Sequence, residues 1–256
     1  MASNKSSPLL SIVIPAYNEA ANFRSGVLQP ALDYMRGQKY AWEVIFVDDG
    51  STDDTHNLLS GLAKKDSRIQ VLKISHGGKA AAVTAGMLAA GGDYVLFTDF
   101  DQSTPLYQVG KFLAAHRRGA DVVIGHRTQT QNDTLIRRIR SWGFVILVQT
   151  VALPGITDTQ CGFKSFTRPA AQKIFRSLIA CRPVGTITGG YMGAFDVEAL
   201  FLARKFGYTI VEVPVSWIKI LSDRLNIWKE PIKMALDTLK VRLWDILGKY
   251  DQVHSG

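Results

Sequence analysis

The sequence predicts an α/β protein with a mostly parallel central sheet flanked by helices, and two observations predict it. Short runs of β-branched and apolar residues alternate along the chain with helix-length stretches rich in Ala and Leu. Of the 256 residues, 46% are hydrophobic and 20% are charged, which excludes a disordered chain and provides the apolar surface for a large core. Alternating strand and helix signals are typical of sheets whose strands run parallel.

Six runs have the pattern of strands, and they lie, in chain order, at Leu10–Pro15, Trp42–Asp48, Ile69–Ile74, Tyr94–Asp99, Asp121–Gly125 and Thr209–Ile218. Three stretches between the early runs have the length of helices: Ala20–Arg36, Asp53–Lys65 and Lys79–Ala90. Another helix is expected to begin at Phe195. Ligands bind where the carboxyl ends of parallel strands meet, so the residues that directly follow each run are the candidates for chemistry.

We expect three parts in the chain: a polar tail over residues 1–9, an α/β domain over residues 10–225, and a C-terminal amphipathic helix with a tail over residues 226–256. The longest apolar stretch, Trp142–Ile156, is interrupted by Pro154. It is shorter than the about 20 apolar residues that a spanning helix needs. With 30 Lys and Arg against 22 Asp and Glu, the formal charge is +8. That charge favours phosphorylated small molecules, other polyanions or an anionic membrane surface.

Acidic residues follow two of the predicted strands. Asp99 ends one run and Asp101 stands two residues further on, whereas Asp48 ends another run and Asp49 follows it. Paired carboxylates suit Mg²⁺ or Mn²⁺, which take one or two of them and fill the other positions with water and substrate phosphates. A carboxylate after the second run can also accept hydrogen bonds from a nucleobase or a ribose. The alternative is that these acids are solvated turn or helix-cap residues.

A glycine turn, His76–Lys79, precedes an Ala-rich helical stretch. It is not a P-loop, because that motif needs Ser or Thr after the lysine and the chain has Ala80. Such a turn can deliver Lys79 and free helix N–H groups to an anion. A solvated lysine beside a glycine turn is the alternative.

Four motifs in this order resemble those of the inverting GT-A glycosyltransferases of family 2: Pro15-Ala-Tyr-Asn-Glu19, Val47-Asp-Asp-Gly-Ser-Thr52, Gly78-Lys79 and Asp99-Phe-Asp101. Two later motifs, Asp158-Thr-Gln-Cys-Gly-Phe-Lys164 and Phe195-Asp-Val-Glu198, are similar to those of the polyprenyl-phosphate hexosyltransferases. Within that group the chain looks most like the dolichyl-phosphate β-glucosyltransferases, with the dolichol-phosphate mannose synthases as near relatives. The resemblance spans residues 10–225.

The resemblance implies a GT-A fold and a metal-dependent, inverting transfer of a hexose, glucose favoured, from a nucleotide-diphosphate sugar to a polyprenyl or dolichyl phosphate. It assigns Pro15, Tyr17 and Glu19 to the nucleoside of the donor. It assigns Asp49 to the base, with Lys79 beside it.

For the metal, the resemblance implies Asp99 and Asp101 as the ligands of Mg²⁺ or Mn²⁺, with Asp99 also touching ribose or sugar. Such an ion would neutralise the charge that develops on the nucleoside diphosphate as the glycosidic bond breaks. Some mannose synthases carry a third ligand, a glutamine, at the place of Ser103.

For the acceptor, the resemblance implies Arg137 and Ser141, four residues apart, as the pair that meets the lipid phosphate, and Arg127 as the arginine on the diphosphate side. Arginine grips phosphate oxygens with two parallel hydrogen bonds. No catalytic histidine is expected, because a phosphate monoester is largely dianionic at neutral pH.

The resemblance also implies that Asp158, Gln160, Asp196 and Glu198 line the sugar and acceptor side, and Arg224 is a further candidate for substrate binding. We take Asp158 as a candidate catalytic residue together with Asp101, Arg137 and Ser141. Asp196 has an alternative role as a helix cap. Arg224 keeps the cation of a loop that reads Gly-Ser-Lys in the glucosyltransferases.

Other functions remain open from the sequence. Mannosyl transfer from GDP-mannose to the same acceptor is one. A sugar nucleotidyltransferase is another, although it would carry a glycine-rich, basic loop where this chain has residues 15–19. A non-catalytic nucleotide-sugar binding protein is a third. Nucleic-acid binding is not expected, because no nucleic-acid recognition module accompanies the positive charge.

A polyprenyl phosphate is held in a membrane, so we expect a cytoplasmic protein peripheral to a membrane surface. Over Ile227–Leu247, apolar residues interleave with lysines and an arginine. Such a helix can lie in the membrane interface. The alternative is an amphipathic helix packed on its own core. Trp142–Leu153 is the second candidate surface.

Overall fold

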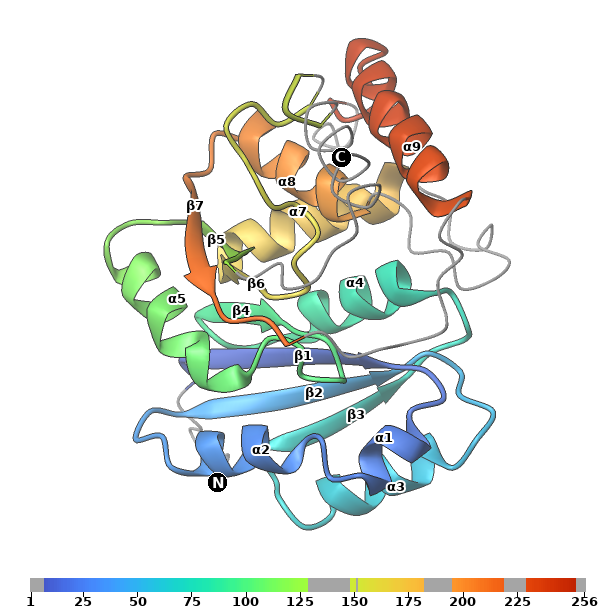
Figure 1. The fold of residues 1–256 in the computed structure, drawn as a ribbon, viewed down its shortest axis with the longest axis vertical. Coiled ribbons are helices and arrows are strands. Elements are labelled where there is room, and N and C mark those ends of the chain that lie inside the picture. Colours follow the sequence, from blue (N-terminus) through green and yellow to red (C-terminus); the bar gives the residue numbers. More distant parts are fainter. Residues whose placement is uncertain (1–6, 129–147, 151, 182–194, 219–228, 252–256) are drawn as a thin grey trace, which may run out of the picture.

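The computed structural model describes residues 7–128, 148–150, 152–181, 195–218 and 229–251. Within these ranges seven strands form one sheet in the order β3-β2-β1-β4-β6-β5-β7 (Figure 1). The strands are β1 Leu10–Ala16, β2 Trp42–Asp48, β3 Ile69–Lys73, β4 Tyr94–Phe97, β5 Val122–Arg127, β6 Lys164–Thr167 and β7 Ile210–Val215. The helices are α1 Ala20–Arg24, α2 Gln29–Arg36, α3 Thr55–Ala63, α4 Lys79–Ala89, α5 Val109–Arg117, α7 Arg168–Cys181, α8 Phe195–Lys205 and α9 Lys229–Ile246.

The predicted α/β class and the mostly parallel sheet are confirmed, and all six predicted strands are present. Neighbours β3-β2-β1-β4 run parallel, and so do β5 and β7. The unpredicted strand is β6, which lies between β4 and β5 and is antiparallel to both. It therefore joins the two parallel parts of the sheet.

Helices cover both faces of the sheet, and each face has its own core. On one face, α2, α3 and α5 bury residues such as Met35, Leu59 and Phe112 against the strands. On the other, α4, α7 and α8 bury residues such as Met87 and Phe175. Figure 1 shows α9 beyond α8, at the opposite end of the molecule from β2 and β3.

The predicted helix over residues 20–36 is in fact two helices, α1 and α2. Gly26 between them has a φ of +79°, a backbone conformation that side chains disfavour and that a continuous helix cannot include. The stretch is rich in Ala and Leu, and the sequence prediction did not treat this glycine as a break in the helix.

The predicted C-terminal helix is present as α9. The proposed part boundaries at residues 9 and 225 stay predictions, and residue 225 lies outside the described residues. Among the helices of the described ranges, none is both long and apolar enough to cross a bilayer.

Candidate active site

The carboxyl ends of β1, β2 and β4 lie at one edge of the sheet, because the three strands are parallel neighbours. Ala16 is paired with Asp48, and Val13 with Phe97. The motifs that follow these strands are therefore neighbours in space although they are far apart in the sequence. Lys79 begins α4 at the same edge, after β3.

The loops after β1 and β2 are tied together by Asn18, which has a φ of 53°. Its side-chain Oδ1 accepts hydrogen bonds from the backbone N–H groups of Thr52 (2.8 Å) and Asp53 (3.3 Å). Its own N–H donates to Ser51 Oγ at 3.0 Å. These bonds fix the position of Tyr17 relative to the acids that end β2.

Asp49 is buried and holds the glycine turn before α4. Its carboxylate accepts hydrogen bonds from Gly77 N (2.8 Å) and Gly78 N (2.9 Å), and His76 Nδ1 lies 2.9 Å from the same carboxylate. The Tyr17 ring stacks on the His76 ring with 4.3 Å between centroids. The acid thus shapes the turn that presents Lys79, and a half-exposed aromatic pair lies beside it.

Lys79 lies among three carboxylates. Its ammonium forms an ion pair with Asp99 Oδ1. Burial lowers the pKa of Lys79, but the charges of Asp99, Asp196 and Asp101 outweigh burial and raise its pKa above the ordinary lysine value. Lys79 therefore stays protonated, and its ammonium lies near both the acids that follow β4 and Asp196 of α8.

Asp101 is oriented by Ser103. Oδ1 of Asp101 accepts hydrogen bonds from Ser103 N (2.9 Å) and Ser103 Oγ (2.8 Å). Among the described residues, nothing donates a hydrogen bond to its second oxygen, Oδ2. Gln102, with a φ of 55°, turns the chain sharply between the two acids. Ser103 stands where some mannose synthases carry a glutamine, and here its N–H and hydroxyl donate hydrogen bonds to Asp101.

Arg127 and Asp158 form an ion pair with two parallel hydrogen bonds, Nε to Oδ2 at 2.7 Å and Nη2 to Oδ1 at 2.8 Å. Burial raises the pKa of Asp158, but the hydrogen bonds and charge of Arg127 prevail and hold that pKa below its ordinary value. The guanidinium also lies over the Trp217 ring, 5.5 Å from its centroid. Asp158, expected as a catalytic residue, here orients Arg127.

Glu212 of β7 supports this pair and was missed by the sequence interpretation. Its carboxylate accepts hydrogen bonds from Asp158 N (3.0 Å) and Thr157 N (2.9 Å). Its acidic side chain inside an apolar strand pattern was the signal that could have identified it.

Lys164 of β6 is a second residue that sequence reasoning did not single out. Its side chain is fully buried, and its ammonium donates to Cys161 O and to Asp196 Oδ1, both at 2.5 Å. The Lys164 ammonium also lies 5.3 Å from the centre of the Phe97 ring. Because Asp196 acts on the pKa of Lys79 as well, its carboxylate links the buried lysine to the sheet edge.

The remaining predicted residues are placed as follows. Pro15 lies in β1 opposite Val47. The carboxylate of Glu19 accepts a hydrogen bond from Asn22 at 2.5 Å, and Gln160 is exposed, with its N–H donating to Asp158 at 3.2 Å. The expected roles of these residues stay predictions. Arg137, Ser141 and Arg224 lie outside the described residues.

A divalent cation fits one part of this edge. Mg²⁺ and Mn²⁺ are commonly held by one or two carboxylates together with water and substrate phosphates. Oδ2 of Asp101 has no protein donor in the described ranges, whereas Asp99 is paired with Lys79. Within those ranges no group of three His, Cys, Asp or Glu side chains is placed to hold a metal. The residues therefore fit an ion shared with a substrate, not one enclosed by protein.

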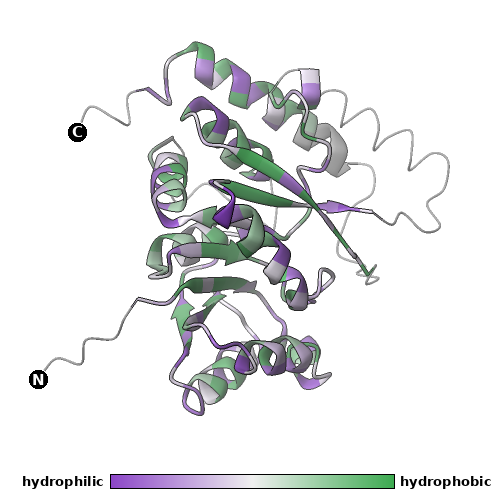
Figure 2. Cartoon of the chain, turned by 90° about the vertical axis from the view of Figure 1, so that its left-hand side faces the viewer, coloured by the Kyte–Doolittle hydropathy of each residue, from purple (hydrophilic) through white to green (hydrophobic). Residues whose placement is uncertain are grey.

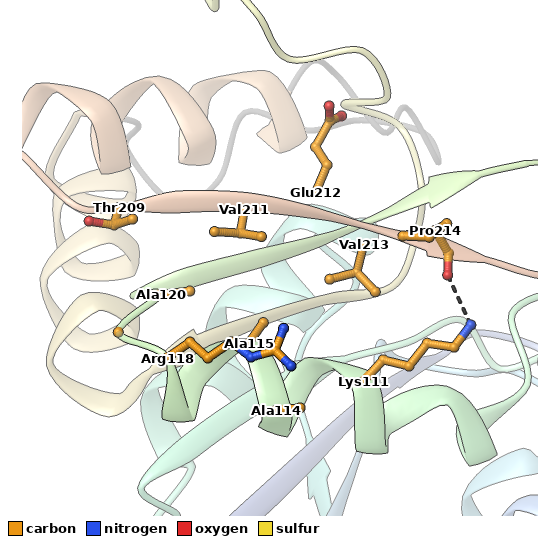
Figure 3. Close-up of a pocket in the computed structure, with 11 residues that line it drawn as sticks. Lys111, Ala114, Ala115, Arg118, Ala120, Thr209, Val211, Glu212, Val213 and Pro214 are labelled. Atoms are coloured by element: carbon orange, nitrogen blue, oxygen red, sulfur yellow. Dashed lines mark hydrogen bonds between the residues drawn. The ribbon is translucent and has the colours of Figure 1, made fainter.

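A cavity of about 500 Å³ lies between α5 and β7, away from these acids (Figure 3). Lys111 and Arg118 are on its helix side, and the Lys111 ammonium donates to Pro214 O at 3.0 Å. Glu212 points away from α5, towards the side where it supports Asp158. The cavity walls are mostly Ala, Val and backbone, and the candidate chemistry lies elsewhere.

Comparisons with known proteins agree with the fold. Residues 11–175, more than half of the chain, match the family model described as glycosyl transferase family 2. The dolichyl-phosphate beta-glucosyltransferase of Dictyostelium discoideum is 35% identical over 257 residues, which covers 93% of this chain and 75% of that protein. The Saccharomyces cerevisiae protein of the same name is 34% identical, covering 94% and 76%.

Among solved structures, glucosyl-3-phosphoglycerate synthase from Mycobacterium tuberculosis in complex with Mn²⁺, UDP-glucose and phosphoglyceric acid has a TM-score of 0.56 at 19% identity. The match covers 95% of this chain and 80% of that one. At this identity the likeness shows the fold alone. Together with the family model and the relatives, it establishes that the chain belongs to glycosyl transferase family 2 and is a glycosyltransferase with the expected GT-A fold.

Proposed function

We propose that this chain transfers glucose, with inversion, from a nucleotide-diphosphate sugar, UDP-glucose favoured, to dolichyl phosphate or another polyprenyl phosphate. The observation that carries the proposal is the identity of 34–35% with two proteins of that name over 93–94% of the chain. The edge of the sheet supports it, because Lys79, Asp99 and Asp101 meet there beside an aromatic pair.

The donor side of the site has groups for each portion of a nucleotide sugar. Tyr17 and His76 offer aromatic surface for a base next to the Asp49 turn. Lys79 remains cationic beside Asp99 and can bind an anionic diphosphate that displaces part of this ion pair. Arg127, held by Asp158, is the second cation near Asp99.

In the transfer step, an oxygen of the acceptor phosphate attacks C1 of the glucose. The bond between C1 and the diphosphate oxygen breaks, and its electron pair leaves on the nucleoside diphosphate. Attack from the opposite face inverts the configuration at C1. No protein base has to remove a proton, because the second pKa of a phosphate monoester is about 6.

Asp101 would hold the divalent cation through its Oδ2, which accepts no hydrogen bond from the described residues, and Ser103 would keep that carboxylate in place. The cation, Mg²⁺ or Mn²⁺, supplies positive charge that stabilises the departing nucleoside diphosphate. The protein cations Lys79 and Arg127 bind the two anionic substrates from other sides and orient them for the attack.

The test is a donor and acceptor matrix with the purified chain. We would incubate it with Mg²⁺ or Mn²⁺, with dolichyl phosphate or a short polyprenyl phosphate, and with UDP-glucose or GDP-mannose, and analyse the organic phase for a glycolipid. We expect glucolipid from UDP-glucose. Mannolipid from GDP-mannose alone would assign the alternative hexose, and pyrophosphate exchange without glycolipid would indicate a nucleotidyltransferase and contradict the proposal.

We also propose that α9 lies on the membrane that holds the acceptor. Its exposed apolar residues are 47–71% exposed and form a stripe: Leu236, Leu239, Leu243, Ile246 and Leu247. At about 100° per residue these positions fall within an arc of roughly 100°. The opposite face packs on the protein, since Val241 is buried and the helix contacts α8.

The charged residues on α9 indicate that a bilayer, and not a second copy of the chain, covers this apolar stripe. On the helix, Lys240 and Arg242 flank the apolar arc on its two sides, whereas Asp237 and Asp245 lie on the opposite side. Cations beside an apolar stripe suit anionic lipid headgroups. Two copies of this stripe facing each other would oppose like charges. Figure 2 shows hydrophobic and hydrophilic residues alternating along this helix.

The test of this surface is sedimentation with vesicles of phosphatidylcholine, with and without phosphatidylserine. We expect stronger binding to the anionic vesicles and at least about tenfold weaker binding by Leu239→Glu/Leu243→Glu, since burying one leucine contributes about 1.5–3 kcal/mol. Ile179→Glu on α7, which changes another exposed apolar residue, is the matched control. Equal binding by the α9 variant, or a dimer that this variant abolishes, would contradict the proposal.

A further inference from the structure

Gly162 lies directly beneath the carboxylate of Asp99. A Cβ built on Gly162 would overlap Oδ2 of Asp99 and would lie 2.6 Å from its Cγ and 2.9 Å from its Oδ1. Its three nearest neighbours are all atoms of this one side chain. The space that a side chain at position 162 would need is therefore filled by Asp99.

The backbone at Gly162 does not itself require glycine. Gly162 is absent from the glycines with positive φ, whereas Gly155 in the preceding loop has a φ of +81°. Alanine at position 162 would thus meet no backbone strain. The nearest conflict would be with the Asp99 carboxylate.

Asp99 uses this space to reach Lys79. Its Oδ1 forms the ion pair with the Lys79 ammonium, and Oδ2 lies over Gly162. The neighbouring acid, Asp101, is instead fixed through its Oδ1 by Ser103. If the Asp99 carboxylate moved off Gly162, Lys79 would lose the anion with which it forms its ion pair.

We propose that Gly162 is a positioning residue for Asp99, because its missing side chain lets the carboxylate lie where it holds Lys79 at the start of α4. This gives a glycine in the segment before β6 a role at the end of β4. The consequence for sugar transfer rests on the proposed function, whereas the positioning itself does not.

The experiment is a double-mutant cycle that follows the chemistry of Lys79 without turnover. The rate of acetylation of Lys79 by an N-hydroxysuccinimide ester would be measured by mass spectrometry in the wild type, Gly162→Ala, Asp99→Ala and the double variant. We expect Lys79 to be acetylated several-fold faster in Gly162→Ala than in the wild type. Asp99→Ala is expected to react as fast as Gly162→Ala, and the double variant no faster than either single variant. Gly110→Ala in α5, where a Cβ would meet nothing within 4 Å, is the matched control.

An acetylation rate in Gly162→Ala equal to that of the wild type would overturn the proposal. So would a faster rate in the double variant than in Asp99→Ala, because Gly162→Ala would then act without the Asp99 carboxylate. If Gly162→Ala does not fold, Gly162→Ala/Asp99→Gly removes the overlapping atoms and is expected to recover the fold. Failure of that variant to recover would equally contradict the proposal. A glucosyl-transfer assay is read separately: we expect a loss of at least tenfold for Gly162→Ala, and full activity would confine the role of Gly162 to structure.

Discussion

The guanidinium of Arg127 and the carboxylate of Asp158 are held in register by three hydrogen bonds, two from the side chain and one from Arg127 N to Oδ2 at 3.1 Å. Asp158 is buried, whereas the Arg127 side chain is 30% exposed to solvent. A carboxylate that accepts three bonds from one arginine fixes the direction of the remaining N–H groups. Arg127 can therefore present them to an anion without further ordering.

Asp158→Ala is expected to destabilise the fold. It leaves Arg127 without its counter-ion, and removing one partner of a buried pair costs about 3–5 kcal/mol. Because Arg127 is partly exposed, we expect roughly 2 kcal/mol in the free energy of unfolding, measured in urea. Asp33→Ala, which removes an exposed ion pair with Arg36, should cost less than about 1 kcal/mol. Equal costs for the two variants would contradict this reading of Asp158.

The stability difference between wild type and Asp158→Ala should depend on pH. The pKa of Asp158 is lower in the folded chain than in the unfolded chain, where it is about 3.9. The ionised carboxyl therefore stabilises the fold above that pH, and its contribution is lost as the pH falls through the folded pKa. We expect a constant difference from pH 7 to about pH 5, and a shrinking one below about pH 4. A difference that grows in acid would be inconsistent with a depressed pKa.

Lys164→Met should lower the free energy of unfolding by about 3 kcal/mol, because it leaves Asp196 without the buried ammonium. Lys164→Met/Asp196→Leu removes both charges and should regain part of that loss. Transfer activity should be low in the double variant, because Lys79 then no longer has the Asp196 carboxylate near it. Urea unfolding and the glycolipid assay check the two parts, and recovery of activity in the double variant would remove the pair from the site.

Ser103→Ala should weaken the binding of the divalent metal ion without affecting the fold. It removes the hydroxyl that donates to Asp101 Oδ1 and leaves the backbone bond in place. Loss of one hydrogen bond to a charged group is worth about 1.5–3 kcal/mol. We expect the Mn²⁺ concentration for half-maximal transfer to rise about tenfold, with Ser60→Ala as control. An unchanged metal requirement would mean that Ser103 does not position Asp101.

The strands and their acidic ends were predictable because buried parallel strands are encoded locally. Runs such as Val44–Val47 are apolar and β-branched or aromatic, and the acids that follow them break the pattern. Strand β6 was not predictable in this way. Its four residues begin with Lys164, and the strand is held between β4 and β5 by pairing with both.

The site was predictable only in part for a similar reason. Asp49, Asp99 and Asp101 are marked by position after strands, and the fold brings them to one edge. Their partners are set by tertiary contacts: Arg127 lies 31 residues from Asp158, and Lys164 lies 32 from Asp196. No periodicity links residues so far apart. The pairing of Asp99 with Lys79 likewise appears only in the folded chain.

The most direct test of the proposed metal site is Mn²⁺ binding in the presence of UDP, followed by electron paramagnetic resonance for the wild type and Asp101→Asn. We expect the wild type to bind one Mn²⁺ with UDP, and Asp101→Asn to lose that binding while remaining folded. Asp54→Asn, which changes an exposed acid paired with Arg24, should bind like the wild type. Full Mn²⁺ binding by Asp101→Asn would contradict the claim that this carboxylate and the substrate's diphosphate share the ion.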